Sequence, residues 1–340
     1  MVRIAAAALC ASVCFALLAD GEGKSTPPAV ARIGGESIVL AKNEKGVLPL
    51  DAKTLKKVLV VGGDAAGEKG GEGGSAAVST NEVSFLDGLR ARLGKDVEVT
   101  GRPFPKKADA KARYELKDLA LAADATVVFA GAEPSSGENR AVAAILSWGA
   151  KNTVVVSRAA ASAAAAWTDA APTLLIGSGL GEEGGGALAR VVLGDESPSG
   201  KLGGAWSAFP LGHGLSYTTF KYGPATVAKT ADGFAVTIGV TNAGKVAGRE
   251  VVQIYASHPG PSDARGAGDL KGFAKTKLLK PGETDIVTVS VPLRGLARFD
   301  AAARRFATEA GDCELRVGSS SGDIRATASV KIDARIEFDD

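Results

Sequence analysis

The chain has 340 residues, of which 45% are hydrophobic, and its formal net charge is +2. This length and apolar content are enough for one large domain or two ordinary domains with substantial cores. Charges of both signs are interspersed along the chain, which argues against a nucleic-acid-binding surface, and we expect no nucleic acid partner.

The amino terminus has the pattern of a secretory signal peptide. Arg3 is followed by the apolar stretch Ile4–Leu18, by Ala19 and then by polar residues. A membrane anchor is the weaker alternative, because a span needs about 20 apolar residues. We expect a signal peptide over residues 1–19, a linker over 20–30 and a secreted or periplasmic protein. No membrane span is expected once the signal is removed.

Cysteine usage is sparse. Cys10 and Cys14 lie inside the expected signal, so Cys313 alone remains in the mature chain and no internal disulfide can form. The alternating segment "GDCELRVG" favours a buried strand position for Cys313. We expect neither a zinc site nor a Cys/His catalyst, and no metal or cofactor.

Residues 31–223 alternate β-branched runs with helical stretches, which predicts an α/β three-layer sandwich around a mostly parallel, doubly wound sheet. The expected strands are Val58–Val61, Val97–Thr100, Thr126–Ala130, Thr153–Ser157 and Thr173–Ile176. Most are nearly continuous apolar runs, as parallel strands covered on both faces should be, while the polar Glu98 favours an edge position. The expected helices are Ile33–Asn43, Asn81–Leu93, Arg113–Ala123, Arg140–Gly149, Ala159–Asp169 and Glu182–Leu193.

After Tyr222 apolar and polar residues alternate, in "FAVTIGVTN", "REVVQIYAS", "DIVTVSVPL" and "CELRVGSSS". Turn residues at Asn242–Gly244 and Lys280–Glu283 separate these runs. The pattern predicts an all-β, immunoglobulin- or fibronectin III-like sandwich over residues 224–340, joined to the first domain at residue 223.

A glycine-rich loop, "GGDAAGEKGGEGGSAAVS" over Gly62–Ser79, follows the first central strand. Gly71–Ala76 has the spelling of a dinucleotide-binding fingerprint. That motif needs its first glycine directly after the strand and a helix immediately beyond. Gly71 lies about ten residues after Val61, so we do not expect a nucleotide here.

Ligands of a doubly wound sheet bind at the carboxyl ends of its strands. The loops expected there are 62–79, 131–140, 158–160 and 177–186. A charge at a helix N-terminus is the simpler explanation for Glu182 and Glu183 in the last of these loops. For Glu138, an ordinary loop acid beside Arg140 and a functional acid are equally compatible with the residues alone.

Several long motifs occur in a fixed order. They are "ESIVLAKNEKGVLPL" (Glu36–Leu50), "GGEGGSAAVS", "AADATVVFAGAEPSSGENR", "GEEGGGALARVVLGDESPSGKL" and "FPLGHGLSYTTFKY". Together they resemble the C-terminal sandwich domain of glycoside hydrolase family 3, the β-glucosidase and β-xylosidase family. The tail from "DLKGFAKTKLLKPGET" is similar to the fibronectin type III-like domain of that family. The resemblance runs from about residue 31 to the C-terminus.

The resemblance implies a sugar site with a general acid/base glutamate. Glu138 best matches that residue, because it stands in the Glu-x-Arg ending of its segment, and Glu133 is the second choice. The substrate-binding residues that the resemblance implies are Gly73, Gly74, Ser75 and Arg140.

Family members normally begin with a (β/α)₈ barrel that carries the aspartate nucleophile and takes about 250 residues. The segment between Ala19 and the first family match at Ala31 has no room for a barrel, so we expect none. A retaining glycosidase needs two opposed carboxylates about 5–5.5 Å apart. We therefore predict a β-glucosidase-like protein that is not an independent hydrolase and acts as a carbohydrate- or partner-binding module.

The alternative is one subunit of a split β-glucosidase or β-xylosidase that supplies the general acid/base. In either case we expect a β-linked glycan as ligand. The sheet edge that the family buries against its barrel would be uncovered here, so we also expect a barrel-domain partner or a homo-oligomer.

His213 stands where the resembling family usually has tyrosine. No serine motif or paired carboxylate surrounds it, so a histidine in the connector between domains is favoured over a catalytic one. His258, beside Pro259, has the same interpretation.

Overall fold

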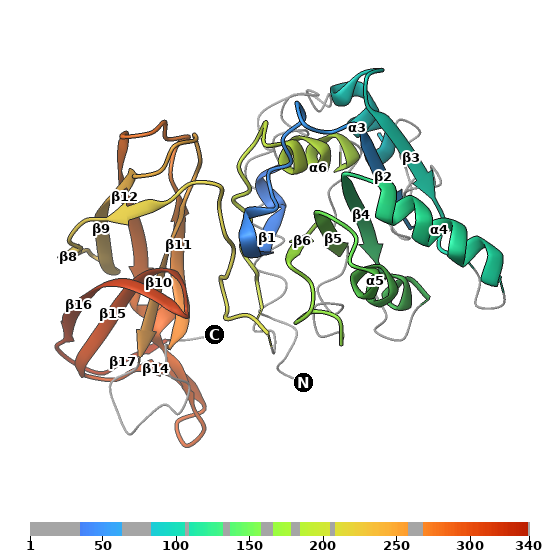
Figure 1. Cartoon of the computed structure of the whole chain (residues 1–340). Helices are drawn as coiled ribbons and strands as arrows, with labels where there is room; N and C mark the ends of the chain where they lie inside the picture. Colours follow the sequence, from blue (N-terminus) through green and yellow to red (C-terminus); the bar gives the residue numbers. More distant parts are fainter. Residues whose placement is uncertain are drawn as a thin grey trace, which may run out of the picture.

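The computed structural model describes residues 35–62, 83–105, 109–131, 137–157, 166–177, 184–204, 208–257 and 268–338. They form an α/β domain followed by an all-β domain that lies beside it (Figure 1). The predicted fold class, an α/β three-layer sandwich followed by an immunoglobulin-like β-sandwich, is confirmed.

The α/β domain is built on a six-stranded sheet. Its strand order is β1 (Val39–Asn43), β6 (Thr173–Ile176), β5 (Thr153–Ser157), β4 (Ala125–Ala130), β2 (Lys57–Val61) and β3 (Glu98–Arg102). All neighbouring pairs are parallel except β1 and β6, which are antiparallel. Every residue of β4, β5 and β6 is buried, because these apolar strands are covered on both faces.

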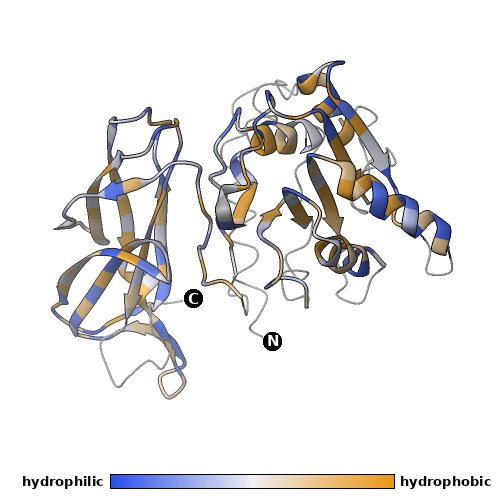
Figure 2. Cartoon of the chain, in the orientation of Figure 1, coloured by the Kyte–Doolittle hydropathy of each residue, from blue (hydrophilic) through white to orange (hydrophobic). Residues whose placement is uncertain are grey.

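Two pairs of helices cover the sheet. α3 (Phe85–Leu93) and α6 (Gly184–Leu193) share one hydrophobic cluster, and α4 (Ala110–Ala122) and α5 (Gly137–Trp148) share the other. Successive residues of β2 alternate between the two clusters, as the two-residue period of a strand requires. α6 is mostly hydrophobic, whereas α4 carries hydrophilic residues along its exposed side (Figure 2).

The predicted strands of this domain are confirmed to within one or two residues, and Glu98 does lie on the edge strand β3. The predicted helix Ile33–Asn43 is wrong: after one helical turn at residues 35–37, residues Val39–Asn43 form β1, followed by the short 3₁₀ helix η1 (Glu44–Gly46). Tertiary pairing decides this segment, because β1 hydrogen-bonds to β6 on one side and Leu40 bridges to Leu215 on the other. Most of the predicted helix Ala159–Asp169 lies outside the described residues, and its described end is a turn.

The second domain consists of antiparallel sheets. One contains β11 (Asp269–Lys275), β10 (Val251–Ser257), β15 (Gly311–Ser320) and β16 (Asp323–Ile332). The second contains β12 (Thr284–Pro292), β9 (Gly233–Asn242), β7 (Phe220–Tyr222) and β8 (Thr226–Lys229), and the 3₁₀ helix η4 (Leu293–Leu296) follows β12. A small third sheet is made of β13 (Arg298–Asp300), β14 (Arg305–Thr308) and β17 (Ile336–Phe338).

The β-domain core lies between its two larger sheets. Alternate residues of β9, from Phe234 to Val240, point into this core, and Cys313 of β15 is buried there at 1% exposure. The predicted core position of Cys313 is therefore confirmed. Because β7 already pairs with β9, the sheet of this domain begins at Phe220, slightly ahead of the predicted join at residue 223.

Candidate functional site

The carboxyl ends of β2, β4, β5 and β6 meet at one edge of the sheet, where doubly wound folds bind ligands. Gly62, Gly131 and Gly177 directly follow three of these strands. Gly62 has a φ of +130°, and a Cβ atom there would lie 2.9 Å from the Cβ of Phe129. Glycine is needed at this exit from β2, because a side chain would fit neither the backbone angle nor the space.

Of the residues that the sequence assigns to this edge, the structure describes Glu138 and Arg140. Both lie in the first turn of α5, just beyond the carboxyl end of β4. Glu138 is half-buried and Arg140 is exposed. The other predicted site residues lie outside the described residues; they are Gly73, Gly74, Ser75 and Glu133. Glu182 and Glu183 also lie outside the described residues.

The surroundings of Glu138 are those of an acid at a helix start. A helix N-terminus attracts negative charge, because its first backbone N–H groups have no partner within the helix. Glu138 forms no hydrogen bond or ion pair with another residue that the structure describes. This location is compatible with an ordinary acid beside Arg140 and with a functional acid. The assignment of Glu138 as general acid/base therefore stays a prediction.

Sequence reasoning missed Asn139, which lies between the two candidate residues. Its side chain is only 3% exposed; its Nδ2 donates to the carbonyl of Gly131, and its Oδ1 accepts from Nε1 of Trp167. One signal was present in the sequence. Asn139 precedes Val142 and Ile145 at three-residue spacing, so it stands on the face of α5 that packs into the core.

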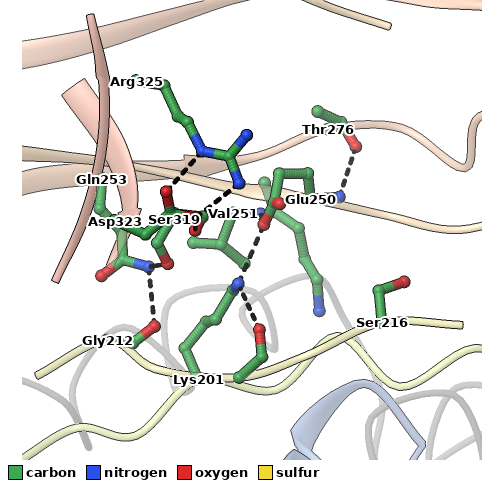
Figure 3. A network of polar contacts seen from close by, with 12 residues as sticks. Lys201, Gly212, Ser216, Glu250, Val251, Gln253, Thr276, Ser319, Asp323 and Arg325 are labelled. Atoms are coloured by element: carbon green, nitrogen blue, oxygen red, sulfur yellow. Dashed lines mark hydrogen bonds and ion pairs between the residues drawn. The ribbon is translucent and has the colours of Figure 1, made fainter. Parts of the chain in front are cut away.

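A second cluster of polar side chains lies where the two domains meet (Figure 3). Lys201 Nζ is 3.1 Å from Glu250 Oε1 and donates to the carbonyl of Gly214 at 2.8 Å. Gln253 Nε2 donates to the carbonyl of Gly212 at 3.1 Å. These groups are satisfied by one another across the join, so we interpret the cluster as a domain interface rather than a ligand site.

His213 belongs to the same connector. Its Nε2 is 2.9 Å from the carbonyl oxygen of Ala41 in β1, and its ring stacks on Phe209 with centroids 5.0 Å apart. Burial lowers the pKa of His213; the Ala41 carbonyl opposes this shift, and the positive charge of Lys201 adds to it. These contacts agree with a connector histidine. His258 lies outside the described residues.

Two other sequence-based interpretations concern ligands. The glycine stretch Gly71–Ala76, which we judged not to be a nucleotide site, lies outside the described residues. Within the described ranges, no group of three or more His, Cys, Asp or Glu side chains is arranged to hold a metal ion. Over the same part of the chain, no helix has both the length and the apolar character of a membrane span.

Comparison with known families matches both domains. Residues 38–229 match the model of the glycosyl hydrolase family 3 C-terminal domain, and residues 250–321 match that of a fibronectin type III-like domain. The fold and the family models together define a two-domain protein, with an α/β sandwich and an appended fibronectin type III-like β-sandwich. The chain belongs to glycosyl hydrolase family 3, since the first match covers more than half of its residues.

Individual proteins of known sequence or structure are also similar to this chain. An exo-α-(1→6)-L-arabinopyranosidase of Bifidobacterium longum is 32% identical, over 88% of this chain and 48% of that protein. A β-glucosidase of Bacteroides ovatus is 30% identical, over 87% of this chain and 50% of that protein. The solved structure of a family 3 β-glucosidase from Bifidobacterium adolescentis superposes with a TM-score of 0.77 at 29% identity, over 93% of this chain and 55% of that one. The chain spans about half the length of the curated relatives it matches.

Proposed function

We propose that this chain forms one wall of a sugar site, bearing Glu138 and Arg140, and that it does not cleave glycosidic bonds on its own. The observation that supports this most directly is the position of both residues in the first turn of α5, at the ligand-binding edge of the sheet. Membership of a glycosidase family makes a glycan the favoured ligand class, and we propose a β-linked oligosaccharide.

The chemistry of glycoside hydrolysis supports the second half of the proposal. Hydrolysis with retention requires a nucleophilic carboxylate and an acid about 5–5.5 Å apart, on opposite sides of the scissile bond. Two other described acids, in the first turn of α3 and at the N-cap of α4, have structural partners. Asp87 accepts a hydrogen bond from Ser84, and Asp109 caps α4. We therefore propose that neither of these described acids is the nucleophile, and that a further domain or subunit supplies it.

Calorimetric titration of the full chain with β-linked gluco- and xylo-oligosaccharides tests the sugar site. We expect saturable binding that Glu138→Gln or Arg140→Ala weakens. Lys111→Ala, a change at an exposed position of α4, serves as the control and should bind like the parent. Absence of binding to all glycans, including an α-L-arabinopyranoside suggested by one relative, would overturn the proposal.

A second candidate function is that of a subunit in a split hydrolase. It is favoured by the match of this chain to about half of these two curated relatives, because the other half of each has no counterpart in the sequence compared. Mixing the chain with a nucleophile-bearing barrel domain from the same source should then create turnover of an aryl β-glucoside. Sedimentation of the mixture and of the chain alone would distinguish a barrel partner from self-association.

We also propose that the protein is exported to a secreted or periplasmic location, with cleavage after Ala19. The supporting pattern is Arg3 followed by the apolar stretch Ile4–Leu18. Amino-terminal sequencing of protein purified from its source tests this directly, because an intact Met1 would contradict it.

A further inference from the structure

Asn139 is an unusual residue for its position. It occupies the first turn of α5 with 3% of its surface exposed, and a buried amide is costly unless its donor and its acceptor are both satisfied. Its immediate neighbours in the chain are Glu138 and Arg140, the two described residues that the proposed sugar site uses. A buried polar side chain between two site residues calls for a physical explanation.

The hydrogen bonds of Asn139 join three separate segments. Nδ2 donates to the carbonyl oxygen of Gly131, at the end of β4, with a distance of 3.1 Å. Oδ1 accepts from Nε1 of Trp167 at 2.9 Å, and Trp167 is itself 4% exposed and packed in the core cluster beneath α5. One amide thus ties the start of α5 both to the sheet and to the segment that precedes β6.

We propose that Asn139 and Trp167 are positioning residues of the sugar site, which fix the direction in which Glu138 and Arg140 project. This inference rests on the proposed function, because it assigns a role at that same site. Consecutive residues of an α-helix are separated by about 100° around its axis. With Asn139 locked into the core, Glu138 and Arg140 are held on either side of it, at the carboxyl edge of the sheet.

The geometry requires an amide at this position. Asparagine offers a donor and an acceptor at the same time, and both are used here. Aspartate keeps the acceptor for Trp167 but places a charged oxygen against the carbonyl of Gly131. Alanine removes both bonds. Trp167→Phe is the most selective change, because it keeps an aromatic ring in the core and removes the indole N–H donor.

The first measurement is amide hydrogen exchange in the full chain. Amides of residues 141–143 donate to the carbonyls of the first turn of α5, so they report its opening. In Trp167→Phe they should exchange about tenfold faster, which corresponds to the loss of about one buried hydrogen bond, and in Asn139→Ala, which loses both bonds, at least as fast. Amides near the end of α5, at residues 145–148, should be unchanged. Trp148→Phe is the matched control: Trp148 packs against the same cluster from the last turn of the same helix, and its replacement should leave the first turn as protected as in the parent.

The second measurement tests whether the hydrogen bond between Asn139 and Trp167 affects glycan binding. In titrations with the β-linked oligosaccharide that the parent binds best, Trp167→Phe should weaken binding about as much as Glu138→Gln does, and Trp148→Phe should not. Combining Trp167→Phe with Glu138→Gln should add little, because both changes act through the same contact.

Each outcome decides a separate point. Unchanged exchange at residues 141–143 in both variants would show that the hydrogen bonds of Asn139 do not hold the start of α5 in place. Faster exchange with undiminished glycan affinity would overturn the positioning role and leave the proposed function intact. A parent chain that binds no glycan would overturn the proposed function and the assignment of this pair to a sugar site, while the exchange data would still report whether the amide holds α5 in place.

Discussion

Lys201 and Glu250 form a nearly buried ion pair across the join between the two domains. Their Nζ and Oε1 atoms are 3.1 Å apart, and the side chains are 14% and 9% exposed. Glu250 also accepts from the backbone N–H of Val251, and Lys201 donates to the carbonyl of Gly214. Charges held this far from water remain favourable only while each keeps its partner, so each of these two residues depends on the other across the join.

Removing one member of this pair should be strongly destabilising. Lys201→Met leaves the carboxylate of Glu250 buried without its cation, and such a loss typically lowers the free energy of unfolding by about 3–5 kcal/mol. Scanning calorimetry provides the measurement. The control is Lys111→Met, because Lys111 pairs with Glu115 on the exposed face of α4, where a pair is worth less than about 1 kcal/mol. Equal effects of the two variants would contradict the interface described here.

His213 should make stability depend on pH in the mildly acidic range. Burial lowers its pKa in the folded protein below the ordinary value of 6.5. As pH falls through 6.5 the unfolded chain takes up a proton that the folded protein resists, so the free energy of unfolding decreases. The expected slope is at most about 1.4 kcal/mol per pH unit for one proton. Denaturant unfolding between pH 8 and pH 5 should show a shallower dependence for His213→Gln, and parallel curves would rule this effect out.

The contact between α3 and α6 should tolerate no side chain at Gly185. A Cβ atom there would lie 2.3 Å from the carbonyl carbon of Ser84 and from the carbonyl oxygen of Val83, which are backbone atoms that cannot swing away. We expect Gly185→Ala to lower the free energy of unfolding by about 3 kcal/mol, despite the better helix propensity of alanine. Gly203→Ala is the control, since nothing lies within 4 Å of its added methyl group. A Gly185→Ala protein as stable as Gly203→Ala would show that the two helices are less closely packed.

Much of the fold was predictable because local pattern and final environment agree. The runs at β4, β5 and β6 are apolar throughout, and in the structure both faces of each strand are buried. The helix prediction for Ile33–Asn43 was wrong because a short apolar run such as Ile38–Ala41 is compatible with either a helix or a strand. Its outcome depends on pairing with β6, more than 130 residues later in the chain.

The candidate site was predictable only in part. Glu138 could be singled out because its segment, with the Glu-x-Arg ending, resembles the family segment that carries the general acid/base. The partners of Asn139 could not be predicted from the sequence. Trp167 lies 28 residues away, and its hydrogen bond to Asn139 forms only once α5 has packed on the sheet. The domain interface is subject to the same limit: Glu36 and Lys275 are 239 residues apart.

The most direct test of the account is steady-state hydrolysis of an aryl β-glucoside by the purified chain alone, measured beside Glu138→Gln. We expect both proteins to leave the rate in buffer unchanged, because one wall of a sugar site without an opposed nucleophilic carboxylate cannot cleave the glycosidic bond. Turnover by the parent that Glu138→Gln abolishes would contradict it, and would mean that a second catalytic carboxylate lies within this chain.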